Sequence, residues 1–272
     1  MPQASVNGIN IHYRETGEGF PVVFIHGYTG NSRNWALTVP ALRESFRTVS
    51  MDLRGHGLSA KPVGRDDYLF DAMANDVLGL VDQLGVRECY LAGHSMGGMV
   101  AQKIALARPE LVRALVLVDT SASNQDSSRT HMRVGLLKIA EKQGMEAAFE
   151  AQLGMDPAAD EIRSNPEAVR VWREQFLMTS LEAYLYCSEA MAERESLLKE
   201  LRRVAIPTLI VCGERDEPFM EPSRQMHEAI PGSELAIIPG AGHSPQFETP
   251  VEFNRVLVGF LSRVHQTAPA RP

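Results

Sequence analysis

The chain has few cysteines and no long hydrophobic run, and each shortage excludes a class of protein. Its three cysteines, Cys89, Cys187 and Cys212, are odd in number, far apart and without a CxxC pair, so neither a disulfide framework nor a zinc site is expected. No apolar run approaches the roughly 20 residues of a membrane-spanning helix. The first residues also lack the basic and apolar segments of a secretory signal. We therefore expect a cytoplasmic protein with no membrane partner and no metal.

The chain also lacks an excess of positive charge. Its 272 residues include 27 Lys and Arg against 34 Asp and Glu, a formal net charge of −7, and no basic stripe runs along it. Nucleic-acid binding is therefore not expected, because phosphates would go unneutralised. A hydrophobic share of 44% and a charged share of 22% are typical of a globular protein. Nothing in the sequence calls for an organic cofactor.

Apolar runs alternate with helical patterns over most of the chain. A hairpin is predicted around Asn7-Gly8, and an apolar helical stripe is predicted over 67–84, with Asp71, Asp76 and Asp82 pointing elsewhere. A strand-helix series of this kind predicts a parallel sheet covered by helices on both faces. The predicted strands are 21–27, 47–52, 88–94, 111–119, 207–213 and 234–240, and further helices are predicted at 32–45, after Ser95 and at 250–265.

A long helical insertion interrupts the series. From about Ser121 to Arg203 the sequence shows no strand-like run, only helical stretches rich in Met and Glu. We therefore predict a core made of residues 1–121 and 204–272, with a helical cap, or lid, over residues 122–203.

The stretch AGHSMGGMV, residues 92–100, places Ser95 between a predicted strand and a predicted helix. The small residues Gly93, Gly97 and Gly98 allow a tight turn there. A serine in such a turn lies above the carboxyl edge of the sheet, where open α/β sheets bind their ligands. The N-terminus of the following helix would favour negative charge beside it. The pattern predicts that Ser95 is a nucleophile.

Two other residues follow predicted strands and complete this chemistry. His243 lies in the Gly-rich loop after the strand ELAIIP and is the predicted base, since a serine hydroxyl needs a group to take its proton. His94 is expected to point away from Ser95. Asp216, after the strand PTLIVC, is the predicted acid that orients the base, with Asp119 as its rival because it too ends a strand.

The remaining site residues are predicted from their positions along the chain. Backbone N–H groups of Tyr28 and Met96 are expected to form an oxyanion hole. A largely apolar substrate pocket is also expected, because large apolar side chains lie near the nucleophile and in the cap. Its expected substrate-binding residues are His26, Trp35, Met99, Trp172 and Phe176.

In order along the chain, the motifs VVFIHG, DLRGHGLS, GHSMGG, GERDEP and GAGHSPQFE resemble those of the α/β-hydrolase fold family. The resemblance implies a mostly parallel eight-stranded sheet flanked by helices, with a helical cap and a Ser-Asp-His triad in that order. Dehalogenase and epoxide-hydrolase relatives carry an aspartate where this chain has Ser95. The loop HGYTGNSRNW also lacks the Gly-Pro-Gly-rich stretch usual in C–C bond hydrolases.

The resemblance is greatest to the carboxylesterase and perhydrolase-like group. It implies a serine hydrolase that cleaves a small, largely apolar carboxylic ester through an acyl-enzyme, without a cofactor. Alternatives with the same triad are a C–C bond hydrolase of a diketo (meta-cleavage-type) acid, a lactone or thioester hydrolase, a perhydrolase, and a binding protein with little turnover. A C–C bond hydrolase of an acidic substrate predicts an Arg reaching into the pocket, whereas a plain esterase predicts an apolar, uncharged pocket.

Overall fold

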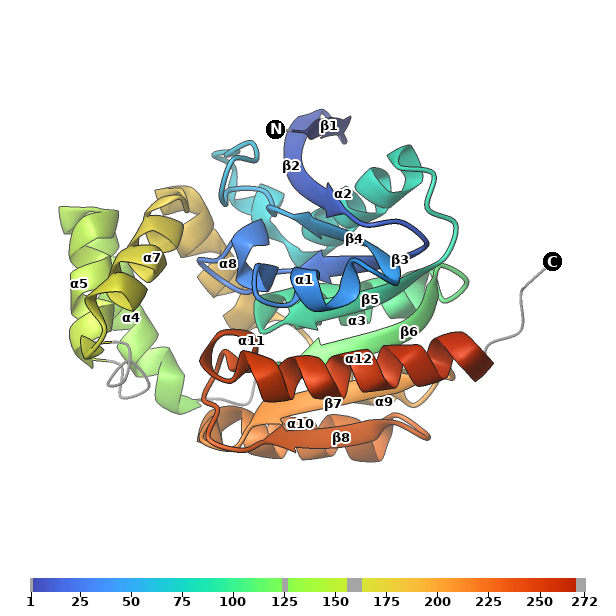
Figure 1. Cartoon of the computed structure of the whole chain (residues 1–272). Coiled ribbons are helices and arrows are strands. Elements are labelled where there is room, and N and C mark those ends of the chain that lie inside the picture. Colours follow the sequence, from blue (N-terminus) through green and yellow to red (C-terminus); the bar gives the residue numbers. More distant parts are fainter. Residues whose placement is uncertain (1, 124–126, 156–162, 268–272) are drawn as a thin grey trace.

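The computed structural model describes residues 2–123, 127–155 and 163–267, and one eight-stranded sheet forms its centre (Figure 1). The spatial order is β1-β2-β4-β3-β5-β6-β7-β8. Only β1 and β2 pair antiparallel with their neighbours, so the predicted mostly parallel eight-stranded sheet is confirmed. The strands are β1 (Gln3–Val6), β2 (Ile9–Thr16), β3 (Phe20–Ile25), β4 (Phe46–Met51), β5 (Cys89–His94), β6 (Val112–Val118), β7 (Thr208–Gly213) and β8 (Glu234–Ile238).

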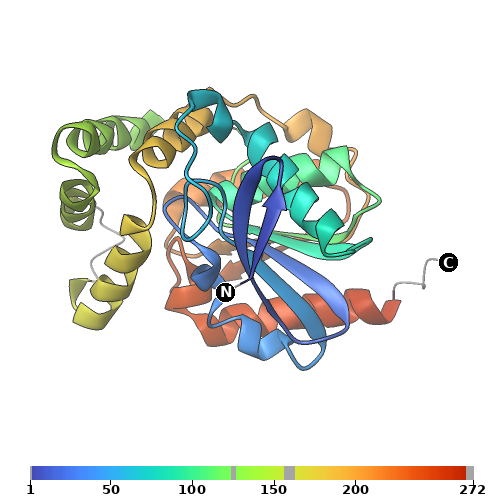
Figure 2. The same cartoon turned by 90° about the horizontal axis from the view of Figure 1, so that it is seen from above.

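Helices cover both faces of this sheet (Figure 2), because the inner strands bury side chains on each face. In β3, Val23 and Ile25 face one apolar cluster, while Val22 and Phe24 face the other. The first cluster includes side chains of α2 (Phe70–Gln83), α3 (Met96–Ala107), α9 (Leu198–Leu201) and α10 (Glu217–Ala229). The second includes side chains of the short helices η1 (Ser32–Trp35) and α1 (Val39–Leu42) and of α12 (Pro250–Thr267).

The single helix expected over 32–45 is instead the two short pieces η1 and α1. The Asn31 side chain accepts from the Arg33 amide at 2.9 Å, and the Asn34 side chain accepts from the Asn31 amide at 3.0 Å. Side chains that bond the local backbone in this way compete with a regular helix. Pro40 then begins a new turn, since it lacks the N–H of a helix interior.

Asp76 on α2 is buried, although the sequence places it off the apolar stripe of the helix. The Arg54 guanidinium donates to both Asp76 carboxylate oxygens, at 2.6 and 2.7 Å, and the Asn7 side-chain amide donates at 3.2 Å. A buried carboxylate is tolerated when it is paired and hydrogen-bonded in this way. The sequence pattern missed it because Arg54 lies on a distant loop.

Residues between β6 and β7 form helices beyond the carboxyl ends of the strands (Figure 1). They share a small apolar cluster of their own, made of Ala140, Ala148, Phe149, Phe176 and Tyr184. We call α4 (Ser127–Gln143), α5 (Met145–Met155), α7 (Pro166–Leu177) and α8 (Leu181–Glu193) the helical segment. Two further short helices, η2 (Arg65–Tyr68) and α11 (Pro245–Glu248), lie in the described part of the chain. None of the helices described is long and apolar enough to cross a membrane.

Candidate active site

Ser95 occupies a strained turn between β5 and α3. Its backbone φ of 51° and ψ of −117° are values that a serine rarely adopts. The turn closes because two neighbours lack side chains. A Cβ on Gly93 would lie 2.3 Å from the Gly97 carbonyl oxygen, and a Cβ on Gly97 would lie 2.4 Å from the carbonyl oxygens of Ile25 and His26. Glycine at both positions therefore lets α3 pack directly against β5 and the end of β3.

Three side chains meet at the carboxyl edge of the sheet. His243, in the loop after β8, places its Nε2 atom 3.0 Å from Ser95 Oγ. Its Nδ1 atom lies 2.7 Å from Asp216 Oδ2, in the loop after β7. An ionised carboxylate only accepts, so Nδ1–H donates to Asp216 and Nε2 accepts from the Ser95 hydroxyl. The arrangement is that of a nucleophile, a base and an orienting acid.

The acid and the base of this arrangement differ in how far they are buried. The Asp216 side chain is only 2% exposed and that of His243 is 28% exposed, so the acid is enclosed while the base faces the open side. The Phe219 ring lies 4.7 Å from the His243 ring, centroid to centroid. Glu248 accepts from the amides of Gly242 and Ser244, at 2.5 and 2.8 Å, and so braces the loop on both sides of His243.

His94 does not point away from the site, which makes that expectation wrong. Its Nε2 atom lies 2.7 Å from the His243 carbonyl oxygen, and the two rings are 5.1 Å apart. Burial, with the nearby His243 ring contributing, lowers the pKa of His94 to about 3. A neutral His94 therefore donates Nε2–H to the His243 backbone. The sequence missed this contact because it depends on the path of a loop 149 residues further on.

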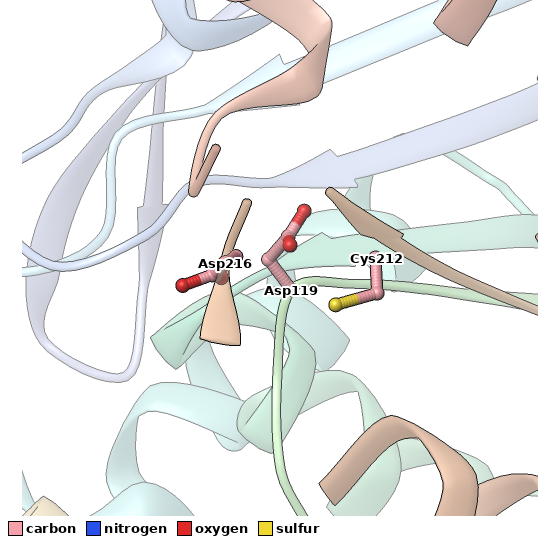
Figure 3. Close-up of side chains that lie close together, drawn as sticks. All are labelled: Asp119, Cys212 and Asp216. Atoms are coloured by element: carbon pink, nitrogen blue, oxygen red, sulfur yellow. The ribbon is translucent and has the colours of Figure 1, made fainter. Parts of the chain in front are cut away.

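Asp119 lies beside Asp216 and Cys212 (Figure 3), but it does not take the place of Asp216 next to His243. Side-chain atoms of Asp119, Asp216 and Cys212 lie within 4.8 Å of one another. Burial raises the pKa of Asp119 well above its ordinary value, and the charge of Asp216 adds to this effect. One Asp119 oxygen accepts from the Gly213 amide at 2.9 Å. Asp119 is thus a neutral acid behind the ionised one, and only Asp216 bonds His243.

The same cluster is poorly suited to hold a cation. Burial raises the pKa of the Cys212 thiol as well as that of Asp119, so two of the three candidate ligands keep their protons. Metal ligands of these types must be deprotonated. The third, Asp216, already accepts from His243.

Two backbone amides are available where an oxyanion would form. Met96 begins α3, so its N–H has no intrahelical partner. Tyr28 follows β3, and within the described part of the chain neither amide donates a backbone hydrogen bond. The Tyr28 hydroxyl donates to the Tyr184 carbonyl of α8, and the two rings stack at 5.2 Å. This contact ties the Tyr28 loop to the helical segment.

A cavity of about 1000 Å³ lies between the sheet edge and the helical segment, with Ser95 and His243 in its wall. Of the predicted substrate-binding residues, Met99 and Trp172 line it. The wall is largely apolar, as expected, and polar and charged side chains are set into it. It includes Tyr28, Leu137, Val171 and Phe247, but also Ser121, Ser123, Arg133, Gln175 and Arg194.

Three other predicted substrate-binding residues, His26, Trp35 and Phe176, are buried elsewhere and do not line the cavity. His26 accepts from the Leu53 amide at 2.9 Å and donates to the Gly27 carbonyl at 2.7 Å, which shapes the loop before Tyr28. Trp35 packs on Phe24 and Phe253 in the core. Phe176 fills the apolar cluster of the helical segment. Composition pointed to large apolar side chains, but not to the direction each one faces.

Comparison with known proteins agrees with this geometry. A family model described as alpha/beta hydrolase fold matches residues 21–250. A putative carbamate hydrolase of Stutzerimonas stutzeri is 30% identical over 93% of this chain and 95% of its own length. The enol-lactonase of Burkholderia xenovorans is 29% identical, with a TM-score of 0.87 over 96% of this chain and 100% of its own. A thermophilic esterase of Thermogutta terrifontis, solved with malate bound, is 28% identical, with a TM-score of 0.86 over 97% and 98%.

The chain therefore belongs to the α/β-hydrolase fold family, as its motifs implied. Within that family it is a hydrolase, and it acts on small molecules.

Proposed function

We propose that this protein hydrolyses a carboxylic ester through an acyl-enzyme formed on Ser95. Ser95 Oγ attacks the carbonyl carbon while His243 Nε2 takes its proton, and Asp216 stabilises the charged ring. The amides of Tyr28 and Met96 donate to the oxyanion of the tetrahedral intermediate. His243 then gives its proton to the departing alcohol, which leaves the acyl group on Ser95.

The second half of the reaction reuses the same groups. His243 takes a proton from water as the water oxygen attacks the acyl carbon. The second tetrahedral intermediate collapses, Ser95 Oγ recovers the proton and the carboxylic acid leaves. One observation carries the proposal: a continuous hydrogen-bond line, 3.0 Å from Ser95 to His243 and 2.7 Å from His243 to Asp216, in the wall of a large cavity.

Ser95→Ala tests the proposal. We expect the kcat for p-nitrophenyl butyrate to fall by a factor on the order of 10⁶, as for a serine nucleophile removed from a triad. The natural chain should show a burst of nitrophenol and should gain the mass of a fluorophosphonate probe on Ser95. Ser5→Ala is the matched control, because Ser5 is exposed on β1. Near-natural activity in Ser95→Ala would reject the assignment.

A lactone is the second candidate substrate. The enol-lactonase of Burkholderia xenovorans covers 96% of this chain at 29% identity, and a lactone carbonyl meets the same nucleophile. In that case the leaving alcohol stays attached to the acyl group until water releases the open hydroxy acid. Product analysis after incubation with a γ-lactone and with a matched open ester decides between the two candidates.

We also propose a role for the helical segment in this reaction. Residues 122–203 act as a cap over the core formed by 1–121 and 204–272, and α4, α7 and α8 supply one wall of the cavity.

A further inference from the structure

Arg194 is a cation in the cavity wall, directly after α8. Its guanidinium donates to the Ser121 hydroxyl at 2.6 Å and to the carbonyl oxygens of Ser123 and Met191. All three acceptors are neutral. Its Nε atom is buried and has no acceptor among the described residues. Arg194 is thus held firmly in place without a charge to balance it.

The electrostatics of this position favour an anion. Burial lowers the pKa of Arg194 to about 10, and the positive charge of Arg133, also in the cavity wall, adds to this effect. No carboxylate among the described residues forms an ion pair with Arg194. Burying a cation is costly unless an opposite charge accompanies it. An anion that entered the cavity would offset both the burial and the repulsion.

Arg194 shares the cavity wall with the nucleophile. Its partner Ser121 directly follows Thr120, whose hydroxyl donates to the Ser95 carbonyl oxygen at 2.7 Å. Because both residues line one cavity, a small molecule bound there can present its carbonyl to Ser95 and its far end to Arg194.

We propose that the substrate carries a carboxylate that Arg194 binds, so that this site hydrolyses small esters or lactones of carboxylate-bearing acids. The inference rests on the proposed function and names its substrate class. A guanidinium suits a carboxylate because hydrogen bonds between a charged donor and a charged acceptor are short and strong. The sequence led us to expect a largely apolar substrate. The cation in the cavity wall instead favours a substrate that carries an acidic group.

A matched pair of substrates tests the inference. The p-nitrophenyl monoester of adipic acid carries a terminal carboxylate, and its adipamate counterpart carries a neutral amide of the same size. We expect the natural chain to favour the adipate in kcat/KM by roughly 10- to 100-fold, the range for hydrogen bonds to a charged group. In Arg194→Met the ratio should fall to near 1. In Arg203→Met, which removes an exposed arginine, it should stay unchanged.

Each outcome decides the matter. Equal kcat/KM for the two esters in the natural chain, or an unchanged ratio in Arg194→Met, overturns the inference. If Arg194→Met does not fold, titration calorimetry on Ser95→Ala still measures binding at this site. Adipate should then bind at least tenfold more tightly than adipamide. Inorganic phosphate that competes as strongly as adipate would overturn the carboxylate assignment. Failure of the proposed function looks different: neither ester is hydrolysed, while adipate binding persists.

Discussion

The two sides of the cavity are built differently. On the sheet side, Ser95, Asp216 and His243 each follow a strand, and backbone bonds fix their places: the Ser95 amide donates to the Val118 carbonyl at 2.8 Å. On the helical side, five buried residues make up the apolar cluster of the helical segment. Its ion pairs, such as that of Arg170 with Glu167, are exposed and contribute little to stability.

This difference indicates a division of labour. The sheet side fixes the reacting groups at the ends of strands, and acyl transfer requires such fixed geometry. The helical side supplies side chains such as Trp172 and Arg194, which can differ without disturbing the triad. Changes on the sheet side should therefore affect every substrate alike, and changes on the helical side should affect which substrate is preferred.

After the loss expected for Ser95→Ala, the largest expected effect separates two acids on the sheet side. Asp216→Asn should lower kcat by about 10⁴-fold, because the amide no longer favours the His243 tautomer that can accept from Ser95. Asp119→Asn should cost less than about tenfold, or 1.4 kcal/mol, since an amide copies the shape and neutral charge of the protonated acid. Rates with p-nitrophenyl butyrate measure both. A larger loss in Asp119→Asn than in Asp216→Asn would assign the triad acid to Asp119.

The next effect concerns acid stability and again belongs to the sheet side. Burial lowers the pKa of His56 and His94 to about 3. Both rings would bind protons in the unfolded chain below about pH 6.5, so they destabilise the fold as the pH falls from 6.5 toward 3. Asp119 has the opposite effect on stability. Its raised pKa lets the folded state bind a proton that the unfolded chain lacks above about pH 3.8, so it stabilises the fold as the pH falls.

Burial also lowers the pKa of His26, so at least two protons on the histidines stand against one on Asp119. Between about pH 5.5 and 4.5 the free energy of unfolding should drop by at least roughly 1.4 kcal/mol per pH unit, and Asp119→Asn should steepen the slope by about 1.4 kcal/mol per pH unit. Urea unfolding across this range measures it. A flat profile in the natural chain would mean that the two histidines are not buried as neutral rings in solution.

The sequence predicts the sheet side of the cavity better than the helical side. Ser95, Asp216 and His243 were predicted because each follows an apolar strand, and parallel strands bring such residues to one edge of a sheet. The buried Asp76 was missed because its partner, Arg54, is distant in sequence. Local periodicity carries no information about such a contact.

The helical side could be predicted only as helices. Trp172 and Phe176 are four residues apart on α7, yet one lines the cavity and the other is buried in the apolar cluster of the helical segment. Their spacing shows that they share an apolar stripe. It does not show which part of that stripe is buried and which part lines the cavity. Arg194 gave no sequence signal either, since its meaning depends on an enclosed position without an acidic partner.

The smallest effect tests the helical side. The Trp172 ring packs edge-on against Phe149, with centroids 5.2 Å apart, and lines the cavity. Trp172→Ala should enlarge the cavity and remove apolar contact, so KM for p-nitrophenyl butyrate should rise by about 3- to 10-fold at a nearly unchanged kcat. The octanoate ester should lose less, because its longer chain fills the new space. Met155→Ala, which removes an exposed side chain of α5, is the control. A fall in kcat that is equal for both esters would mean that Trp172 supports the triad, and the two sides of the cavity would then not be separable.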